Sequence, residues 1–343
     1  MPLAGKIYMF FPKKIVYLIY IGIFELGSLV CALAPTSNAL IVGRAISGLG
    51  ASGIFAGSLI IVATVAPLHK RPLLTGMTNG TFGASQIIGP LIGGAFAQTV
   101  TWRWCFWINL PAGGVSIALI VFYLHLQKGA TEMTPLKQKI LNLDLLGFTL
   151  FAGAVTMLLL ALQWGGVVYT WKSSVIIGLL VGFGLVFAIF LGWQWYAADS
   201  ALVPPRLFHH RTVFLAFGAC LIAPGGVATI IYYLPIWFQA VQGATPVSSG
   251  IRYLPSVISD VLTSIIGGAI VMKIGWYNPF YIFGVAILSI GSGLLTTLTP
   301  TTDVGRWIGY QILTGSGYSF LVTMASLPSQ WKIDDLELKL TIL

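Results

Sequence analysis

Charged residues are scarce in this sequence, which excludes an ordinary soluble protein. Only 8% of the 343 residues are Asp, Glu, Lys or Arg, whereas soluble proteins carry about 25%. Apolar residues make up 57% of the chain. So few charges cannot cover a surface that faces water. The composition therefore predicts a protein that is threaded through a membrane, with the lipid bilayer as its main partner.

Cysteine, histidine and acidic residues are also few, with 3 Cys, 4 His and 9 Asp or Glu in the chain. The cysteines (Cys31, Cys105 and Cys220) lie far apart, without disulfide or zinc spacing. A membrane-embedded enzyme would need a nucleophile, metal ligands or paired carboxylates at one place, and no such cluster is visible. We therefore expect no enzyme, no catalytic residue, no metal and no cofactor. The net charge of +9 comes from basic residues in short loops, so nucleic-acid binding is not indicated.

Long apolar blocks take up most of the chain. A helix needs about 20 apolar residues to cross a bilayer, and the blocks lack the alternation that is typical of barrel strands. We therefore predict an all-α, polytopic membrane protein with about ten transmembrane helices. The predicted spans are 15–34, 38–66, 74–98, 105–125, 145–164, 174–196, 212–239, 253–272, 279–298 and 305–327. Most Lys and Arg residues fall in alternate loops, which predicts a cytosolic N-terminus.

An internal repeat suggests how the spans are grouped. Gly5 precedes a predicted span, and the next span carries Arg44. The same order recurs from Gly268 to Arg306, with nearly the same number of residues between the glycine and the arginine. Two related bundles with substrate held between them are typical of transporters. We therefore expect an N-terminal bundle, a cytoplasmic connector, two extra central helices, a cytoplasmic loop, a four-helix C-terminal bundle and an aberrant polar tail. The boundaries are 1–125, 126–144, 145–196, 197–211, 212–327 and 328–343, respectively.

Small residues recur every four positions in the third span. They let another helix approach closely, and a proline in the same span removes a backbone donor and should bend the helix. Two interpretations stay open: a hinged helix that controls a permeation path, or a tightly packed structural helix. The residues concerned are Gly76, Gly80, Gly83, Ser85, Gly89, Pro90, Gly93 and Gly94.

Several of these patterns resemble the major facilitator superfamily. The run from Gly76 to Gly94 resembles the antiporter motif of its helix five, and Leu40–Gly50 resembles its helix-four motif. Gly5, Lys13 and Lys14 lie where its cytoplasmic loop signature belongs, although Met9 and Pro12 replace the usual acidic residue and glycine. The stretches 24–28, 101–111 and 232–239 are similar to the fungal fourteen-helix drug and toxin exporters.

The resemblance implies an incomplete two-bundle architecture. The first predicted span matches family helix three, so 145–196 become the two extra central helices. Two helices at each end of a fourteen-helix member would then be missing. The tail from Gln330 is consistent with a shifted reading frame and a truncated gene product.

The resemblance also implies proton antiport that exports small lipophilic molecules by alternating access. It associates Arg44 with proton coupling, and Glu25 and Asp260 are further ionisable residues within spans, where charges are costly and need a reason. The similar depths of Glu25 and Arg44 on antiparallel spans lead to the hypothesis that they form an ion pair. Tyr232, Tyr233 and Trp237 are candidates for a cavity lining.

The expected partners are the lipid bilayer, protons and a lipophilic substrate, for a monomer in the plasma membrane. Two alternatives stay open: a sugar or nutrient transporter of the same superfamily, and a non-functional truncated fragment.

Overall fold

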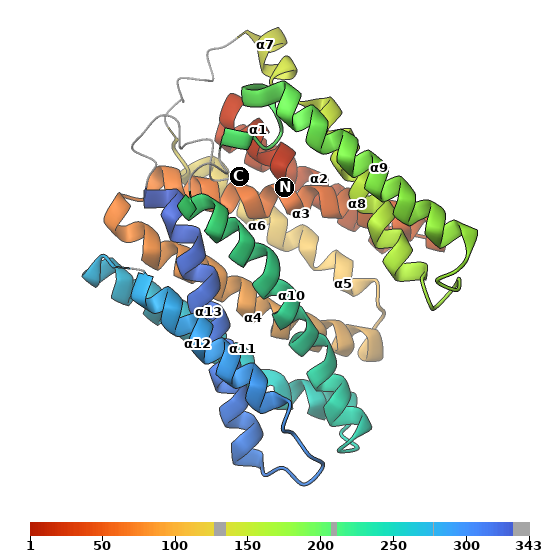
Figure 1. Ribbon diagram of the computed structural model, residues 1–343, viewed down its shortest axis with the longest axis vertical. Coiled ribbons are helices and arrows are strands. Elements are labelled where there is room, and N and C mark those ends of the chain that lie inside the picture. Colours follow the sequence, from red (N-terminus) through yellow and green to blue (C-terminus); the bar gives the residue numbers. More distant parts are fainter. Residues whose placement is uncertain (127–134, 207–210, 277, 332–343) are drawn as a thin grey trace. The chain divides into compact units, whose positions relative to one another are not determined.

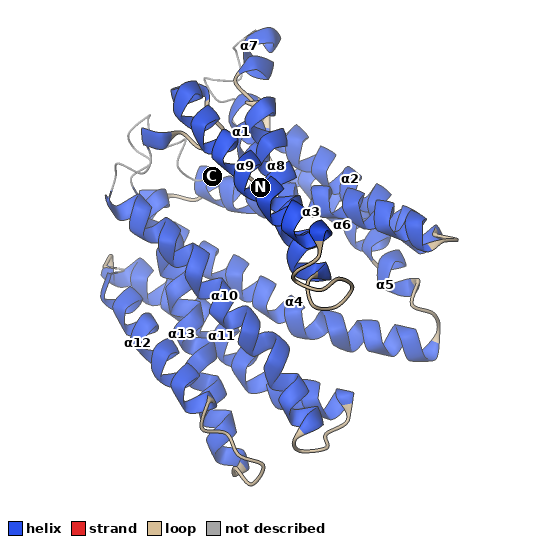
Figure 2. Ribbon diagram, turned by 45° about the vertical axis from the view of Figure 1, so that its right-hand side comes forward, coloured by secondary structure: helices blue, strands red, loops and turns tan. Residues whose placement is uncertain are grey.

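The computed structural model describes residues 1–126, 135–206, 211–276 and 278–331, and these residues are almost entirely helical. Within these ranges no strand occurs, apart from an isolated bridge between Gly165 and Tyr169 in a turn (Figure 2). The all-α prediction is confirmed. The predicted tail from 332 onward, and parts of the connector and the following loop, lie outside the described residues.

Each of the ten predicted spans corresponds to helix in the structure (Figure 1). The predicted span 253–272 corresponds to α11, which begins earlier, at Pro246, and the predicted span 105–125 is divided into α5 and α6. Seven of the helices are long and apolar enough to cross a membrane among the residues searched. The remaining three predicted spans correspond to α4, α10 and α13, which are helices of 29, 30 and 28 residues. The helices are α1 Pro2–Phe10, α2 Lys13–Leu33, α3 Ser37–Val65, α4 Arg71–Thr99, α5 Trp104–Trp107, α6 Asn109–Tyr123, α7 Leu136–Leu141, α8 Leu145–Trp164, α9 Ser174–Ala197, α10 Arg211–Ala240, α11 Pro246–Ile274, α12 Asn278–Leu295 and α13 Val304–Trp331.

Polar side chains fix where several of these helices begin. Thr36, Asp144, Ser173 and Thr245 each accept a hydrogen bond from a backbone N–H in the first turn of α3, α8, α9 and α11. Such N-caps satisfy donors that have no partner within the helix. At the other end of α11, Gly275 adopts φ 79°, a left-handed conformation that glycine takes without steric cost.

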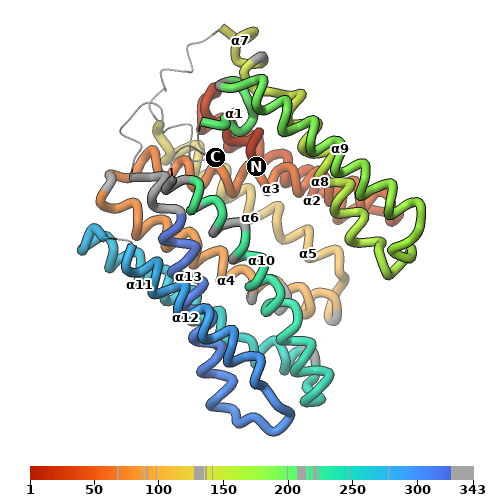
Figure 3. Tube along the Cα trace, in the orientation of Figure 1, coloured from red at the N-terminus to blue at the C-terminus, as the bar shows by residue number. Residues whose placement is uncertain are grey.

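Two compact units divide the described chain. One comprises the described residues of 1–16 and 126–211 and holds α1, α7, α8 and α9; the other comprises the described residues of 17–125 and 212–331 and holds the other helices apart from the first turn of α2. The helices of each unit can be followed along the chain in Figure 3. The first unit therefore groups the N-terminal helix α1 with the two helices at 145–197.

Small residues bring α2 and α3 into close contact within the second unit. Cβ atoms added at Gly43, Gly50 and Gly53 of α3 would meet α2 backbone or side-chain atoms at less than 3 Å. Their neighbours on α2 run in the reverse order, so the two helices are antiparallel. This is the packing that small residues allow between membrane helices.

α11 lies at the centre of the second unit, against both α4 and α13. Its contacts with α13 keep one register: Gln311 Nε2 donates to the Arg252 carbonyl at 2.9 Å, and Ser319 Oγ to the Asp260 carbonyl at 2.8 Å. The constant spacing shows that α11 and α13 are parallel. Helix α12 packs antiparallel on the other side of α13, where Gly284 and Gly291 make room for it.

Candidate functional site

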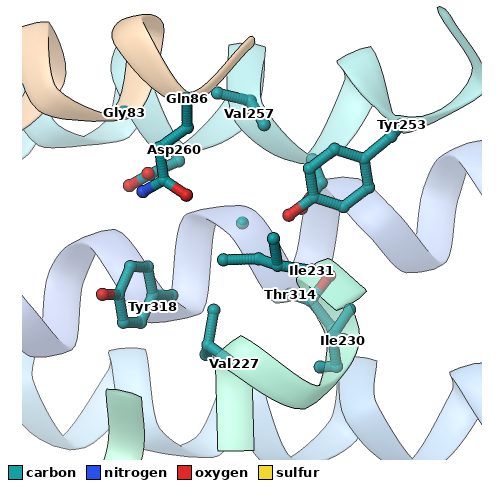
Figure 4. Close-up of a pocket in the computed structure, with 12 residues that line it drawn as sticks. Gly83, Gln86, Val227, Ile230, Ile231, Tyr253, Val257, Asp260, Thr314 and Tyr318 are labelled. Carbon is teal, nitrogen blue, oxygen red and sulfur yellow. The ribbon is translucent and has the colours of Figure 1, made fainter. Parts of the chain in front are cut away.

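A small cavity lies among α4, α10, α11 and α13 (Figure 4). Its polar lining comes from α4, α11 and α13, and α10 supplies only apolar side chains. The cavity has room for the centre of a water molecule over about 20 Å³, enough for one or two waters. Its lining residues are Gly83, Gln86, Val227, Ile230, Ile231, Tyr253, Ser256, Val257, Asp260, Thr314, Gly315 and Tyr318.

One face of α11 supplies the residues that line its side of the cavity. Tyr253, Val257 and Asp260 are four and three residues apart, and Ser256 lies beside them, so one face of α11 presents all of them. Figure 4 shows the carboxylate of Asp260 beside the amide of Gln86, and the Tyr253 hydroxyl turned toward the cavity. Among the described residues that line this cavity, none is basic.

The carboxylate of Asp260 lies directly against α4. A Cβ atom added at Gly83 would be 2.9 Å from Asp260 Oδ2 and 3.4 Å from a methyl group of Val261. The carboxylate can occupy this place because residue 83 has no side chain. The Asp260 backbone is also fixed, since its carbonyl accepts the hydrogen bond from Ser319 of α13. An intramembrane acid is therefore held at the contact of three helices.

The N-terminal half of α4 is joined to α11 and α13 by polar side chains. Ser264 Oγ donates to the Gly76 carbonyl at 2.5 Å and lies 3.4 Å from Thr323 Oγ1. Asn79 Nδ2 donates to the same Thr323 oxygen at 3.3 Å. One turn further along the same face of α11, Gly268 lies against the Pro72 carbonyl. Helices from both predicted bundles thus meet around α11.

The comparison with known families decides the identity of this fold. The profile of the Major Facilitator Superfamily matches residues 1–330. The chain belongs to the Major Facilitator Superfamily. A solved structure of the proton:xylose symporter XylE, described as a member of that superfamily, has the same fold. It matches with a TM-score of 0.59 over 99% of this chain and 72% of that one, at 13% identity.

Curated relatives in the superfamily are fungal transporters. The "MFS-type transporter VdtG" of Byssochlamys spectabilis is 45% identical over 96% of this chain and 59% of its own length. The "MFS-type efflux pump MFS1" of Arthroderma benhamiae is 46% identical over 95% and 61%. The "Efflux pump aunC" of Aspergillus niger is 46% identical over 91% and 59%. This facilitator chain therefore spans about three-fifths of the length of the curated relatives it matches.

The antiporter-like residues of this facilitator chain divide into two groups along α4. Gly76 and Gly83 lie tightly against α11, as the small-residue spacing predicts. Cβ atoms added at Gly89 or Gly94 would meet nothing within 4 Å, and one at Gly93 would meet only the Cys105 sulfur, at 3.8 Å.

Two further motif residues lie in the middle of α4. Ser85 is exposed, and its hydroxyl donates to the Thr81 carbonyl of its own helix. The helix continues through Pro90. The bend that the sequence predicts at Pro90 stays a prediction.

Glu25 and Arg44 are not brought together. Within the described residues no ion pair joins them: one Glu25 oxygen contacts Gly113 of α6, and the other is buried without a hydrogen-bond partner. Arg44 is exposed on α3. Gly43 and Ser47, on either side of Arg44 in the sequence, lie tightly against α2. The hypothesis of a Glu25–Arg44 ion pair is wrong for this conformation.

The candidate aromatic residues do not line the cavity. Tyr232 and Tyr233 are 65% and 61% exposed on α10, and their rings contact each other edge to face. Trp237 packs partly buried beside Phe238. The α10 residues that do line the cavity, such as Ile231, are aliphatic and give no chemical signal in the sequence.

Sequence reasoning missed the polar lining residues Gln86, Tyr253 and Tyr318. The available signal was the spacing of Tyr253 and Asp260, which places both on one helical face. The cytoplasmic signature residues lie elsewhere: Gly5 is within α1, and Lys13 and Lys14 begin α2.

Proposed function

We propose that this chain exports small lipophilic molecules across the plasma membrane, driven by protons that move inward. Asp260 takes up and releases the coupling proton. The observation that supports this role is the position of its carboxylate, in a cavity lined by four helices and directly against glycine-rich α4. Intramembrane carboxylates of this kind form proton relays in transporters.

The geometry supports a link between the proton and the helix contact. Oδ2 of Asp260 lies directly against α4 at Gly83, and a charged carboxylate is less stable than a neutral one where two helices exclude water. A change in the charge of Asp260 therefore changes the free energy of the α4–α11 contact. Alternating access needs such a difference between two states of one interface. The relatives named as efflux pumps favour export as the direction.

The substrate site is proposed to form in a different conformation. The cavity around Asp260 holds only one or two waters, whereas drug-sized ligands need pockets of about 300–1,000 Å³. We infer that substrate enters when α4 and α11 separate, and that the apolar α10 residues then form part of its lining.

The test is dye export from yeast cells that lack their own drug exporters. Cells expressing this chain should lose a lipophilic fluorescent dye faster than empty cells, and a protonophore should abolish the difference. Asp260→Asn should remove gradient-dependent export, whereas the matched control Asp303→Asn, in an exposed loop, should retain it. Export that is unchanged by the protonophore, or full activity of Asp260→Asn, would contradict the proposal.

The same cells distinguish the two alternatives. Faster dye accumulation, or proton-coupled uptake of a sugar, would favour an importer. A chain that inserts into the membrane without any transport would favour a non-functional fragment.

A further inference from the structure

A buried carboxylate organises one end of the α8–α9 pair in the first unit. Asp144, at the N-cap of α8, is 7% exposed. Oδ1 accepts hydrogen bonds from the Gly147 amide at 2.9 Å and from Trp193 Nε1 at 2.7 Å. Oδ2 accepts from Gln194 Nε2 at 3.1 Å and from the Leu202 amide at 2.5 Å. A single carboxylate thus joins the start of α8 to the end of α9.

Lys6 of α1 binds to the same end of the α8–α9 pair. Its ammonium donates to the Asn142 carbonyl at 2.9 Å and to the Ser200 carbonyl at 2.6 Å. These two carbonyls flank the α8–α9 pair, one before α8 and one after α9. Lys6 is 5% exposed, and the Asp144 carboxylate is close enough to act on it electrostatically.

Apolar side chains of α1 are buried as well. Ala4, Tyr8 and Phe10 are 3%, 1% and 6% exposed. Lys139 of α7 lies over the ring of Phe11, with its ammonium 5.1 Å from the ring centroid, within the range of a cation–π contact. α1 is therefore fixed by a buried charge and by apolar side chains together.

We propose that the α8–α9 pair is a docking platform for the cytoplasmic segment α1, and that Lys6 and Asp144 are the lock that fastens it. α1 is followed directly by α2, whose first turn, Lys13–Val16, belongs to the same unit as α1. Lys6 acts as a positioning residue, because it touches only the platform. The inference concerns the first unit alone and does not depend on what the chain transports.

The test is hydrogen–deuterium exchange on the full chain in lipid nanodiscs. Lys6→Met should raise amide exchange about tenfold or more in both α1 and the segment 198–203, because charged hydrogen bonds that hold both are lost. Lys6→Arg, which can donate to both carbonyls, should restore slow exchange. The matched control is Lys137→Met on α7, where the lysine is exposed, and it should leave both segments unchanged.

Three outcomes would overturn the lock: unchanged exchange in Lys6→Met, a rise confined to one of the two segments, or an equal rise in Lys137→Met. Exchange in α12, which belongs to the other unit, reports global unfolding. If α12 also exchanges faster in Lys6→Met, the milder Lys6→Gln is measured, with the same paired rise in α1 and 198–203 expected. Dye export measured in parallel separates the two proposals, since the lock is read from exchange whether or not the chain exports dye.

Discussion

Gly113 of α6 shows how strongly one residue is determined by its neighbour across a helix contact. A Cβ atom there would overlap the Glu25 carboxylate. The overlapped atoms end a side chain that can shift, so we expect Gly113→Ala to lower the free energy of unfolding by about 1 kcal/mol, the low end of the cost of overpacking. The measurement is thermal unfolding in detergent.

Gly114 provides the control, because an added Cβ there meets nothing within 4 Å. Gly114→Ala should be neutral or stabilising, since alanine favours a helix more than glycine does. In Gly113→Ala combined with Glu25→Ala the loss should largely disappear. An equal loss in Gly113→Ala and Gly114→Ala would show that the Glu25 contact is not the cause.

The charge of Lys6 gives stability a defined pH dependence. Burial lowers the pKa of Lys6 to about 8, and the nearby Asp144 carboxylate acts against this shift. Between about pH 8 and pH 10.5 the unfolded chain therefore holds a proton that the folded chain has released, and stability rises with pH. The cost of burying the charged ammonium is fully present below pH 8 and disappears through that window.

The measurement is the difference in unfolding midpoint between wild type and Lys6→Met at about pH 7.5 and about pH 9.5. Wild type should gain relative to the variant at the higher pH. A difference that stays constant, or that moves in favour of the variant, would contradict the assigned pKa shift.

Sequence reasoning at this scale could find the unusual residues but not their partners. Glu25, Arg44 and Asp260 were recognisable because charges within spans are costly. The rotation of each helix about its own axis was not predictable, and it decides that Glu25 contacts Gly113 instead of Arg44. Similarly, neighbouring Gly113 and Gly114 are equivalent in the sequence and differ only in what faces them.

At the scale of helices, hydrogen bonds with α11 and α13 fix the N-terminal half of α4. Ser264 donates across to α4 at Gly76, whereas Ser259 Oγ donates to the Ile312 carbonyl of α13 at 2.8 Å. Both serines lie on α11 and differ in the helix that they reach. We expect Ser264→Ala and Ser259→Ala to lower stability by a similar amount, about 0.6 kcal/mol each, as is typical for hydrogen bonds between membrane helices.

Only Ser264→Ala should raise amide exchange in the first half of α4, because only that serine is bonded to it. Hydrogen–deuterium exchange of 71–83 in the two variants is the measurement. If Ser259→Ala raises amide exchange in 71–83 as much as Ser264→Ala does, the Ser264–Gly76 hydrogen bond is not what protects the first half of α4.

Helix positions were predictable because apolar blocks of span length have few alternative structures in a bilayer. The predicted span 145–164 agrees with α8, and 174–196 agrees with α9 to one residue. The short α1 and α7 were not predicted, because nine and six residues are too few to form a span signal. Lys6 of α1 and Lys139 of α7 are buried, although the sequence presents them as ordinary loop charges.

At the scale of the molecule, the family resemblance predicted the superfamily. The profile match over 1–330 confirms the superfamily. The first unit joins α1 to α8 and α9, which are distant in sequence. That contact depends on backbone carbonyls of Asn142 and Ser200, and carbonyls leave no trace in a sequence pattern.

The direction of the chain across the membrane follows from its loop charges. Lys70 and Arg71 lie between α3 and α4, whereas the turn between α12 and α13 carries threonines and one Asp. Because Lys and Arg are retained in the cytosol, an epitope tag inserted after His69 should be reached only in permeabilised cells, and one after Thr301 should be reached in intact cells. Both sites are exposed, so burial does not bias the comparison. The reverse pattern of antibody access would mean that every predicted span runs in the opposite direction. Access to both tags in intact cells would mean that one predicted span between them does not cross the membrane.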